Sequence, residues 1–443
     1  MKTLFLKIIL GTFLLLTTSC GSGGGESPST EIPAPVSHLS ASSPDSDGLI
    51  RVTAEAGFTD GGTTVTITNP SAVTNLWLDW LIPSAHAHAT HTITSNADGS
   101  FQEEIEGAVG DRLEVTYTVD GAGASADVTV PANTPSLPAT SNIQDVGIDP
   151  NTGTALVVAN DGVDGFIHLI DLSDMSYEST IDLPGASGAS RIATDPTTGD
   201  SIILDTENVT AIHITLSGGG SVVSTTGIID SSDLSAGPSG DYVLIAHTDP
   251  TPALSFFDLA SDSATAIGDS ATEGGTAQES ALFVASDFDG TDDMAGVVSL
   301  MPDSSFLLTT HIIDEIVPSI TQDGAFPLDI TSPGGIFVFS IGAEAFVTDS
   351  STDLALRISL TDGSAVSIDV GDDPRGVAVN ETGLTAYVVN NAGRTVSVIS
   401  LTDDTVTSTE EVGLSPTEIA IGDVGGTATV IVINTGDETA TIF

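Results

Sequence analysis

The chain has 443 residues, of which 61 are acidic and 8 are lysine or arginine, so its formal net charge is −53 at pH 7. A surface of this sign repels phosphate backbones, which excludes nucleic acid as a partner. The 40% hydrophobic content is enough for packed cores, and the length allows two or three domains. Because the acids are spread over both halves of the chain, we interpret them as a sign of a marine or halophilic habitat rather than of cation capture.

The chain begins with a segment typical of secretory signals. Lys2 and Lys7 both lie before an apolar run over residues 8–16, and small residues follow this run. The apolar run is too short to span a membrane as a helix. We therefore predict a signal peptide over residues 1–19 and export from a bacterial cell.

The single cysteine, Cys20, stands directly after this segment, so no intrachain disulfide can form. The sequence Thr17-Thr18-Ser19-Cys20 resembles a bacterial lipoprotein processing site, which implies a lipid anchor on Cys20. Gly21, in place of an aspartate, implies sorting to the outer membrane or cell surface. Ordinary secretion with a chance cysteine is the alternative. Residues 20–35 are rich in Gly, Ser and Pro, which is typical of a flexible tether.

Residues 36–133 have the pattern of a small antiparallel β-sandwich. Short runs with β propensity alternate with turn signals rich in Asn, Asp and Gly. The phrase Asn96-Ala97-Asp98-Gly99-Ser100-Phe101 resembles bacterial immunoglobulin-like and carboxypeptidase-regulatory-like modules. The predicted strands are residues 49–54, 63–68, 90–95, 100–105, 112–119 and 126–130.

The clearest repeat lies in residues 372–413, which read as four strands separated by turns rich in Asn, Asp and Gly. A unit of about 42 residues with four antiparallel strands is one blade of a β-propeller. The strand sequences Ala386-Tyr387-Val388-Val389-Asn390 and Thr395-Val396-Ser397-Val398-Ile399 resemble the YVTN repeat family of propellers. The predicted strands are residues 376–379, 384–389, 395–401 and 405–412.

Similar periods can be laid end to end over residues 139–443, after the proline-rich joint at 131–138. They predict a seven-bladed β-propeller, with six and eight blades as alternatives. The last period has about three strands, so we expect residues 139–146 to complete its sheet and close the ring. The segment 269–293 is interpreted as an insertion. The seven periods are residues 143–183, 189–228, 232–267, 294–330, 333–370, 372–413 and 415–443.

Superimposing the periods places one polar residue at the end of each second strand. Strand ends on one face of a propeller surround the channel, so these groups would form a ligand-binding ring. Arg375 and Arg191, scarce cations at the entry of first strands on the same face, could bind a carboxylate or pair with local aspartates such as Asp372 or Asp195. Turn chemistry explains Asn, Asp and His at strand ends equally well. The predicted ring is Asn160, Asp205, His247, His311, Asp349, Asn390 and Asn434.

Two clusters could bind metal ions. His86, His88 and His91 have spacings that suit Zn²⁺, although a packed loop or a partner surface formed by Trp77 and Trp80 explains the segment too. Asp287, Asp289 and Asp292 alternate around Gly290, as Ca²⁺ ligands do, but the glutamate that ends a full calcium loop is missing. No cofactor other than Ca²⁺ or Zn²⁺ is predicted.

The chain lacks a Gly-x-Ser-x-Gly elbow, a phosphate loop, a dinucleotide fingerprint and a His-Glu-x-x-His motif. We therefore expect a cell-envelope lipoprotein that binds a protein or small molecule through one face of a propeller, without catalysis. The alternative is a metal-dependent hydrolase like the propeller lactonases, which share this architecture. Fold alone does not separate these classes.

Overall fold

A computed structural model describes residues 39–443 except 46–47, 71–89, 139–141, 217–220, 227–230, 239–241, 249–253, 269–271, 274–275, 278–279, 289–292, 302, 315–318 and 340–342. Within these residues the chain is all-β, its strands pair antiparallel, and there is no helix. It follows that the described residues hold no apolar helix of membrane-spanning length.

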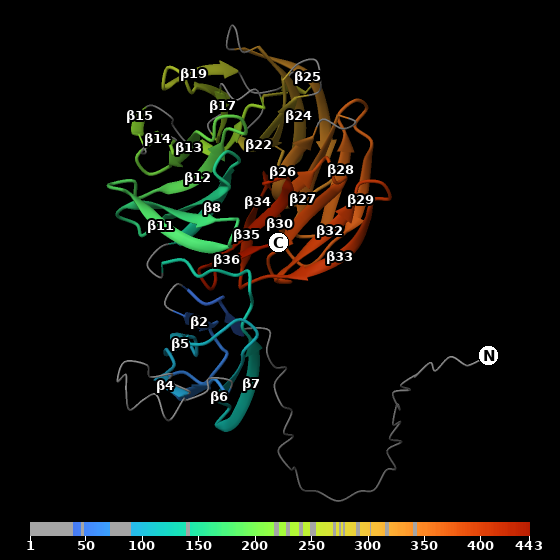
Figure 1. The fold of residues 1–443 in the computed structure, drawn as a ribbon. Helices are drawn as coiled ribbons and strands as arrows, with labels where there is room; N and C mark the ends of the chain where they lie inside the picture. The colour runs from blue at the N-terminus through green and yellow to red at the C-terminus, as the bar shows by residue number, and fades with distance from the viewer. Residues whose placement is uncertain are drawn as a thin grey trace, which may run out of the picture. The chain divides into compact units, whose positions relative to one another are not determined.

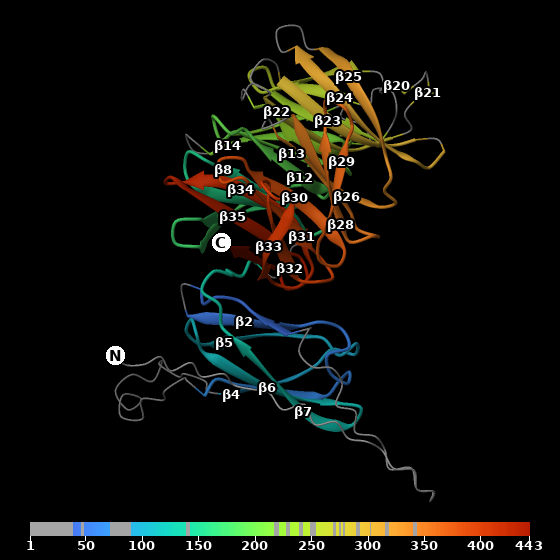
Figure 2. The same ribbon diagram turned by 90° about the vertical axis from the view of Figure 1, so that its right-hand side faces the viewer.

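The N-terminal strands form two sheets that share one core. The sheet orders are β1-β2-β5 and β4-β3-β6-β7, and Figure 2 shows the labelled β2 and β5 in one layer and β4, β6 and β7 in the other. Alternate residues point inward: Ile50 and Val52 of one sheet pack with Val65 and Ile67 of the other. The strands are β1 (Leu39–Ala41), β2 (Leu49–Ala54), β3 (Thr64–Thr68), β4 (Thr90–Thr94), β5 (Phe101–Glu106), β6 (Arg112–Val119) and β7 (Ala122–Thr129).

The rest of the described chain forms six four-stranded sheets, one short strand pair and a last sheet of three strands, and each sheet is a simple meander in chain order. The first sheet is β8 (Asn142–Asp149), β9 (Thr154–Asn160), β10 (Gly165–Asp171) and β11 (Ser176–Leu183). The second is β12 (Ala189–Thr194), β13 (Ser201–Asp205), β14 (Thr210–Thr215) and β15 (Ser221–Thr226). The third is β16 (Ser231–Ala236), β17 (Tyr242–His247), β18 (Leu254–Asp258) and β19 (Ser263–Gly268).

A short strand pair, β20 (Thr272–Glu273) with β21 (Thr276–Ala277), precedes the fourth sheet. That sheet is β22 (Ser280–Phe288), β23 (Asp293–Leu300), β24 (Phe306–Asp314) and β25 (Ser319–Leu328). The fifth is β26 (Pro333–Phe339), β27 (Glu344–Asp349), β28 (Leu354–Ser359) and β29 (Ala365–Asp369). The sixth is β30 (Pro374–Asn380), β31 (Thr385–Asn390), β32 (Thr395–Ser400) and β33 (Thr405–Glu411). The last is β34 (Pro416–Val424), β35 (Thr427–Asn434) and β36 (Thr439–Ile442).

The sheets are arranged around a common centre. The first strand of each sheet contacts the first strand of the next, and β34 contacts β8, so the contacts form a closed ring. Figure 1 shows β8, β12, β22, β26, β30 and β34 toward the middle of this part and β11, β15, β19, β25, β29 and β33 toward its outside. The hydrophobic core lies between successive sheets, as where Leu156 and Val158 pack with Ile192 and Ile203.

The ring is closed by a segment earlier than the predicted one. Asn133 and Pro135 accept backbone hydrogen bonds from Ile442 and Ala440 of β36, and Ser136 forms a bridge with Thr439. The expectation that residues 139–146 do this was wrong, because β8, which begins at Asn142, pairs with β9 of the first sheet. The segment that precedes the first sheet thus pairs with the last strand of the ring.

Most predicted strands agree with the structure to within two residues, but the fourth sheet begins earlier. The sequence pattern predicted a start at 294, with 269–293 as an insertion. In the structure, β22 starts at Ser280 and pairs with β23. This shift changes which strand carries His311.

Candidate functional site

A cavity of about 580 Å³ runs along the first strands of the ring. On the first sheet it is lined by residues 145–148 and Pro150, and on the last sheet by residues 418–423. Matching stretches of the second to sixth sheets complete the wall. Most of its wall is apolar, including Leu234, Phe283 and Ile336. Cavities of this size, with apolar walls and a few polar groups, are the usual form of a small-molecule site.

Four charged side chains meet at one level of this cavity. In every sheet of the ring, the first strand carries a register irregularity a few residues after its start. Such bulges re-aim side chains and are frequent beside functional sites. Asp145, Arg191 and Asp233 directly follow the bulge in β8, β12 and β16, and Glu418 lies within the one in β34. We call these four residues the charged cluster.

Arg191 is the centre of the charged cluster. Its guanidinium donates a hydrogen bond of 2.9 Å to Glu418 Oε1, and its Nε lies 3.8 Å from Asp233 Oδ1. Asp145 and Asp233 also accept backbone N–H bonds of 3.0 Å from Ile192 and Val284, each in the next sheet's first strand. Two of the acids therefore join neighbouring sheets, whereas Glu418 is bonded mainly to Arg191.

The carboxylates of the charged cluster have raised pKa values. Burial raises the pKa of Glu418 to about 7 and that of Asp233 to about 6, although the Arg191 charge opposes both changes. Burial also raises the pKa of Asp145. The Glu418 charge in turn raises the pKa of Arg191, which stays protonated. Because the side chains of Arg191, Asp233 and Glu418 are still 18–27% exposed, water in the cavity reaches them.

The cluster therefore carries more negative charge than one arginine neutralises. Three carboxylates share one guanidinium, so two negative charges remain uncompensated when all are ionised. Uncompensated charge in a partly desolvated site costs stability. Perturbed carboxyl groups inside a cleft are also a feature of binding and catalytic sites.

The predicted ring of strand-end residues lies elsewhere and is bonded to its own surroundings. Asp205, His247, Asp349, Asn390 and Asn434 are buried, and Asn160 is half-buried. None of the six is among the residues that line the cavity. A role for them in ligand binding stays a prediction.

Three of these side chains hold the loop that leads into their own sheet. Asp205 accepts a bond from Gly188 N, Asp349 from Ser332 N, and Asn390 from Gly371 N, at 3.0–3.1 Å. Gly371 makes room for this contact, since a Cβ there would lie 2.7 Å from the Asn390 side chain. Asn434 donates to Thr439 and Thr441, and Asn160 donates to Ala189 O of the next sheet. His247 Nε2 lies 2.8 Å from Ser255 Oγ.

His311 is not at the end of a second strand. Because the fourth sheet begins at Ser280, its second strand is β23, which ends at Leu300, and His311 lies within the third strand, β24. His311 is buried, and its Nε2 lies 2.9 Å from Thr309 Oγ1. Its assignment to the ring of second-strand ends was therefore wrong.

Arg375 lies at the surface rather than in the charged cluster. Its side chain is 44% exposed and forms an ion pair with Asp373, two residues away in the chain, at 3.0 Å. The predicted alternative of a local ion pair named Asp372 as an example of the partner, whereas the structure has Asp373. Arg191, in contrast, bonds to a residue far away in the chain, because Glu418 lies 227 positions from it.

The predicted metal clusters fall largely outside the described residues. His86, His88, Asp289 and Asp292 lie outside them, as do the side chain of Asp287 and the whole of Cys20. His91 is described: it lies on β4, and its Nδ1 is 2.8 Å from Glu103 Oε1. In the part of the chain that the structure describes, no three or more His, Cys, Asp or Glu side chains are grouped to hold a metal ion.

Asp145, Asp233 and Glu418 were not among the site residues predicted from the sequence. That prediction rested on the ends of second strands, whereas the charged cluster lies near the start of first strands. A signal was present: a charged residue stands just before a short apolar stretch in Asp145-Val146, Arg191-Ile192, Asp233-Leu234 and Glu418-Ile419. Aligning the periods on their first strands would have brought these four residues together.

Comparisons with known proteins identify the fold. Hydrazine synthase of Kuenenia stuttgartiensis superposes with a TM-score of 0.56 at 10% identity, over 69% of this chain and 96% of that one. Virginiamycin B lyase of Staphylococcus aureus superposes with a TM-score of 0.50 at 12% identity, over 70% of this chain and 97% of that one. A catalytically inactive form of that lyase, with quinupristin, superposes with a TM-score of 0.50 at 12% identity, over 69% of this chain and 97% of that one.

These structures are β-propeller-like proteins. The chain has a β-propeller-like fold. No protein-family model matches it, and no curated protein matches its sequence. At 10–12% identity the likeness extends to the fold and not to the chemistry.

Proposed function

We propose that this protein is an exported bacterial lipoprotein whose seven-bladed propeller binds a small organic cation in its central cavity, without catalysis. The sheets from β8 to β36 are its blades, and the N-terminal sheets form an immunoglobulin-like sandwich. Cys20 carries the lipid and residues 20–35 are the tether. The protein lies at the outer membrane or cell surface.

The observation that carries the proposal is the charge imbalance of the charged cluster. Asp145, Asp233 and Glu418 face one arginine, and burial raises their pKa values. A ligand with an ammonium or guanidinium group would supply the missing positive charge. Such a ligand would also bind with charge-assisted hydrogen bonds, which are among the stronger polar contacts.

The wall of the cavity favours an organic cation. Beside the charged cluster it presents Val146, Leu234, Phe283, Ile336 and Ile419. A hydrated inorganic ion gains nothing from such a surface, whereas the hydrocarbon part of an amine is removed from water there. The aromatic ring of Phe283 adds a surface on which a cation can rest.

The test is a titration of the full chain, in nonionic detergent at pH 8, with alkylammonium, quaternary ammonium and alkylguanidinium compounds. We expect at least one class to bind and to raise the unfolding temperature. Asp233→Asn combined with Glu418→Gln should weaken this binding at least tenfold, since about 1.4 kcal/mol of lost charge attraction is enough for that factor. Asp303→Asn combined with Asp403→Asn, which alters two exposed acids outside the cavity, is the matched control.

Two results would contradict the proposal. One is equal affinity of the cluster variant and the control variant for every cation. The other is turnover of lactones that requires Ca²⁺ or Zn²⁺ and is lost in Asp349→Ala, which would favour the lactonase-like alternative over a binding protein.

The lipid anchor has its own test. Cys20→Ser should release the protein from the membrane fraction into the soluble fraction, because the thiol that would carry the lipid is removed. Membrane fractionation and metabolic labelling with a fatty acid measure the change, with Ser22→Ala as the control. Continued membrane attachment of Cys20→Ser would contradict lipidation at this residue.

A further inference from the structure

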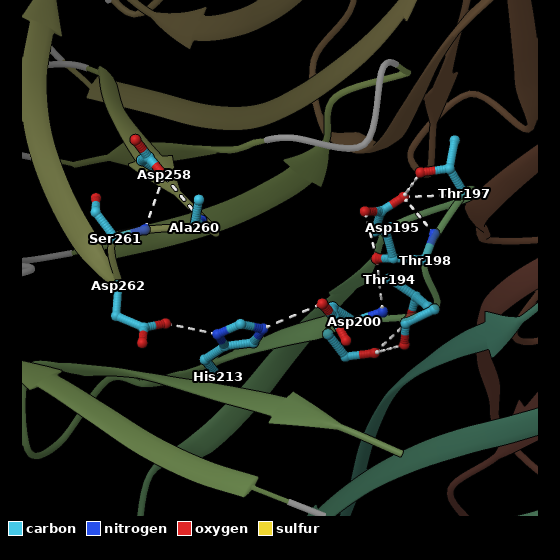
Figure 3. Close-up of polar contacts among 12 residues, drawn as sticks. Thr194, Asp195, Thr197, Thr198, Asp200, His213, Asp258, Ala260, Ser261 and Asp262 are labelled. Atoms are coloured by element: carbon cyan, nitrogen blue, oxygen red, sulfur yellow. Dashed lines mark hydrogen bonds and ion pairs between the residues drawn. The ribbon is translucent and has the colours of Figure 1, made fainter. Parts of the chain in front are cut away.

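A histidine between two aspartates lies outside the cavity (Figure 3). His213 is on β14, the third strand of its sheet, and Asp200 directly precedes β13 of the same sheet. Asp262 precedes β19 in the next sheet. Neither the charged cluster nor the predicted metal clusters include these residues.

The two nitrogens of His213 have different surroundings. Nδ1 lies 2.6 Å from Asp262 Oδ1, which is a short hydrogen bond. Nε2 lies 3.8 Å from Asp200 Oδ2, too far for one. His213 is only 9% exposed, and its buried Nε2 has no hydrogen-bond partner among the described residues.

This arrangement prepares Nε2 to bind a cation. A carboxylate only accepts hydrogen bonds, so Nδ1 must carry the proton that it donates to Asp262. In the neutral imidazole the lone pair is then on Nε2, where it faces the second carboxylate. Histidines that bind metals typically donate their other N–H to a carboxylate in this way.

We propose that a divalent transition metal ion of the zinc type binds between His213 Nε2 and Asp200 Oδ2, while Asp262 orients the imidazole. Zinc lies about 2.0–2.1 Å from a histidine nitrogen and about 2.0–2.2 Å from a carboxylate oxygen. The sum of these lengths exceeds the observed 3.8 Å between Nε2 and Oδ2, so one ion can contact both atoms with a bent N–metal–O angle. Water completes the coordination, because the side chains of Asp200 and Asp262 are 24% and 33% exposed.

Both acids are presented by turns that side chains hold in place. Asp195 accepts bonds from the backbone of Thr197 and Thr198, which shapes the turn before Asp200. Asp258 accepts bonds from the backbone of Ala260 and Ser261, which shapes the turn before Asp262 (Figure 3). These turns therefore hold the two carboxylates in place on either side of the imidazole.

The experiment titrates Zn²⁺ into the full chain in detergent, in a background with His86, His88 and His91 replaced by glutamine. This background removes the histidines of the other predicted metal cluster. We expect one zinc ion per chain, bound at least tenfold more weakly after His213→Gln or Asp200→Asn. Asp262→Asn should weaken binding about tenfold, as the loss of a supporting carboxylate usually does. Asp174→Asn, an exposed acid in a comparable turn, should leave it unchanged.

A second measurement distinguishes coordination from a change in folding. Nitrogen-15 spectra of the His213 ring should show a shift of Nε2 on addition of Zn²⁺, while Nδ1 stays protonated. Asp200→Asn, which changes a partly exposed group, keeps the test valid if His213→Gln does not fold. Zinc binding that is equal in the background chain and in Asp200→Asn, or an unchanged Nε2 signal, would overturn the proposal.

Discussion

Arg191→Gln is expected to destabilise the protein by about 3 kcal/mol at pH 8, because it leaves three partly buried carboxylates without their cation. Removing one partner of a buried ion pair usually costs about 3–5 kcal/mol, and we take the lower end because water reaches the cluster. Chemical denaturation of the wild type and the variant at equal salt concentration measures the difference.

The pH dependence of this loss has a definite sign. Asp233 and Glu418 have pKa values of about 6 and about 7 in the folded protein, above the ordinary values of 3.8 and 4.5. A group with a raised pKa favours folding at low pH and opposes it as the pH rises through that pKa. At pH 5 both groups take up protons and repel each other less, so the effect of Arg191→Gln should shrink.

Two further variants test the same explanation. Arg191→Lys keeps the charge without the planar fork and should lose less stability than Arg191→Gln. Adding Glu418→Gln to Arg191→Gln should recover part of the loss, since it removes one of the uncompensated charges. A loss that is larger at pH 5 than at pH 8 would contradict this account of the charged cluster.

Acid should destabilise the protein through His311, by up to about 3 kcal/mol between pH 6.5 and pH 4. Burial lowers the pKa of His311 to about 4, from an ordinary value of 6.5. The unfolded chain therefore takes up a proton near pH 6.5, whereas the folded protein does so only near pH 4. Stability is fully present above pH 6.5 and is lost as the pH falls through this window.

The measurement is the difference in the free energy of unfolding between the wild type and His311→Gln. The many surface carboxylates titrate equally in both proteins, so their contributions cancel in this difference. The free energy of unfolding of the wild type should fall relative to that of the variant as the pH is lowered from 7 to 4. Burial also lowers the pKa of His168 to about 4, so His168→Gln should give a second, independent case in the first sheet. If the free energy of unfolding changed with pH in the same way in the wild type and in both variants, neither buried histidine would resist protonation.

Local patterns predicted the strands well because they depend on near neighbours in the chain. The turns at 380–383 and 390–393 are rich in Asn and Gly, which favour turns, and the residue directly after each of them, Leu384 and Arg394, has a positive φ. The strands β31 and β32 that follow these turns match the predicted runs closely. The fourth sheet was harder to place, since its first strand follows the pair β20 and β21 rather than a repeated turn. One error in its start was enough to place His311 on the wrong strand.

The sequence by itself determined the antiparallel sheets, the repeated four-strand unit and the large negative charge, because periodicity and composition are properties of the chain alone. Only the tertiary structure decided that Asp145, Arg191, Asp233 and Glu418 meet in one cavity and that Asn133–Leu137 pairs with the last strand. These contacts join residues far apart in the chain: 227 positions between Arg191 and Glu418, and 309 between Asn133 and Ile442. Such contacts depend on how the sheets close into a ring, which no local pattern of side chains specifies.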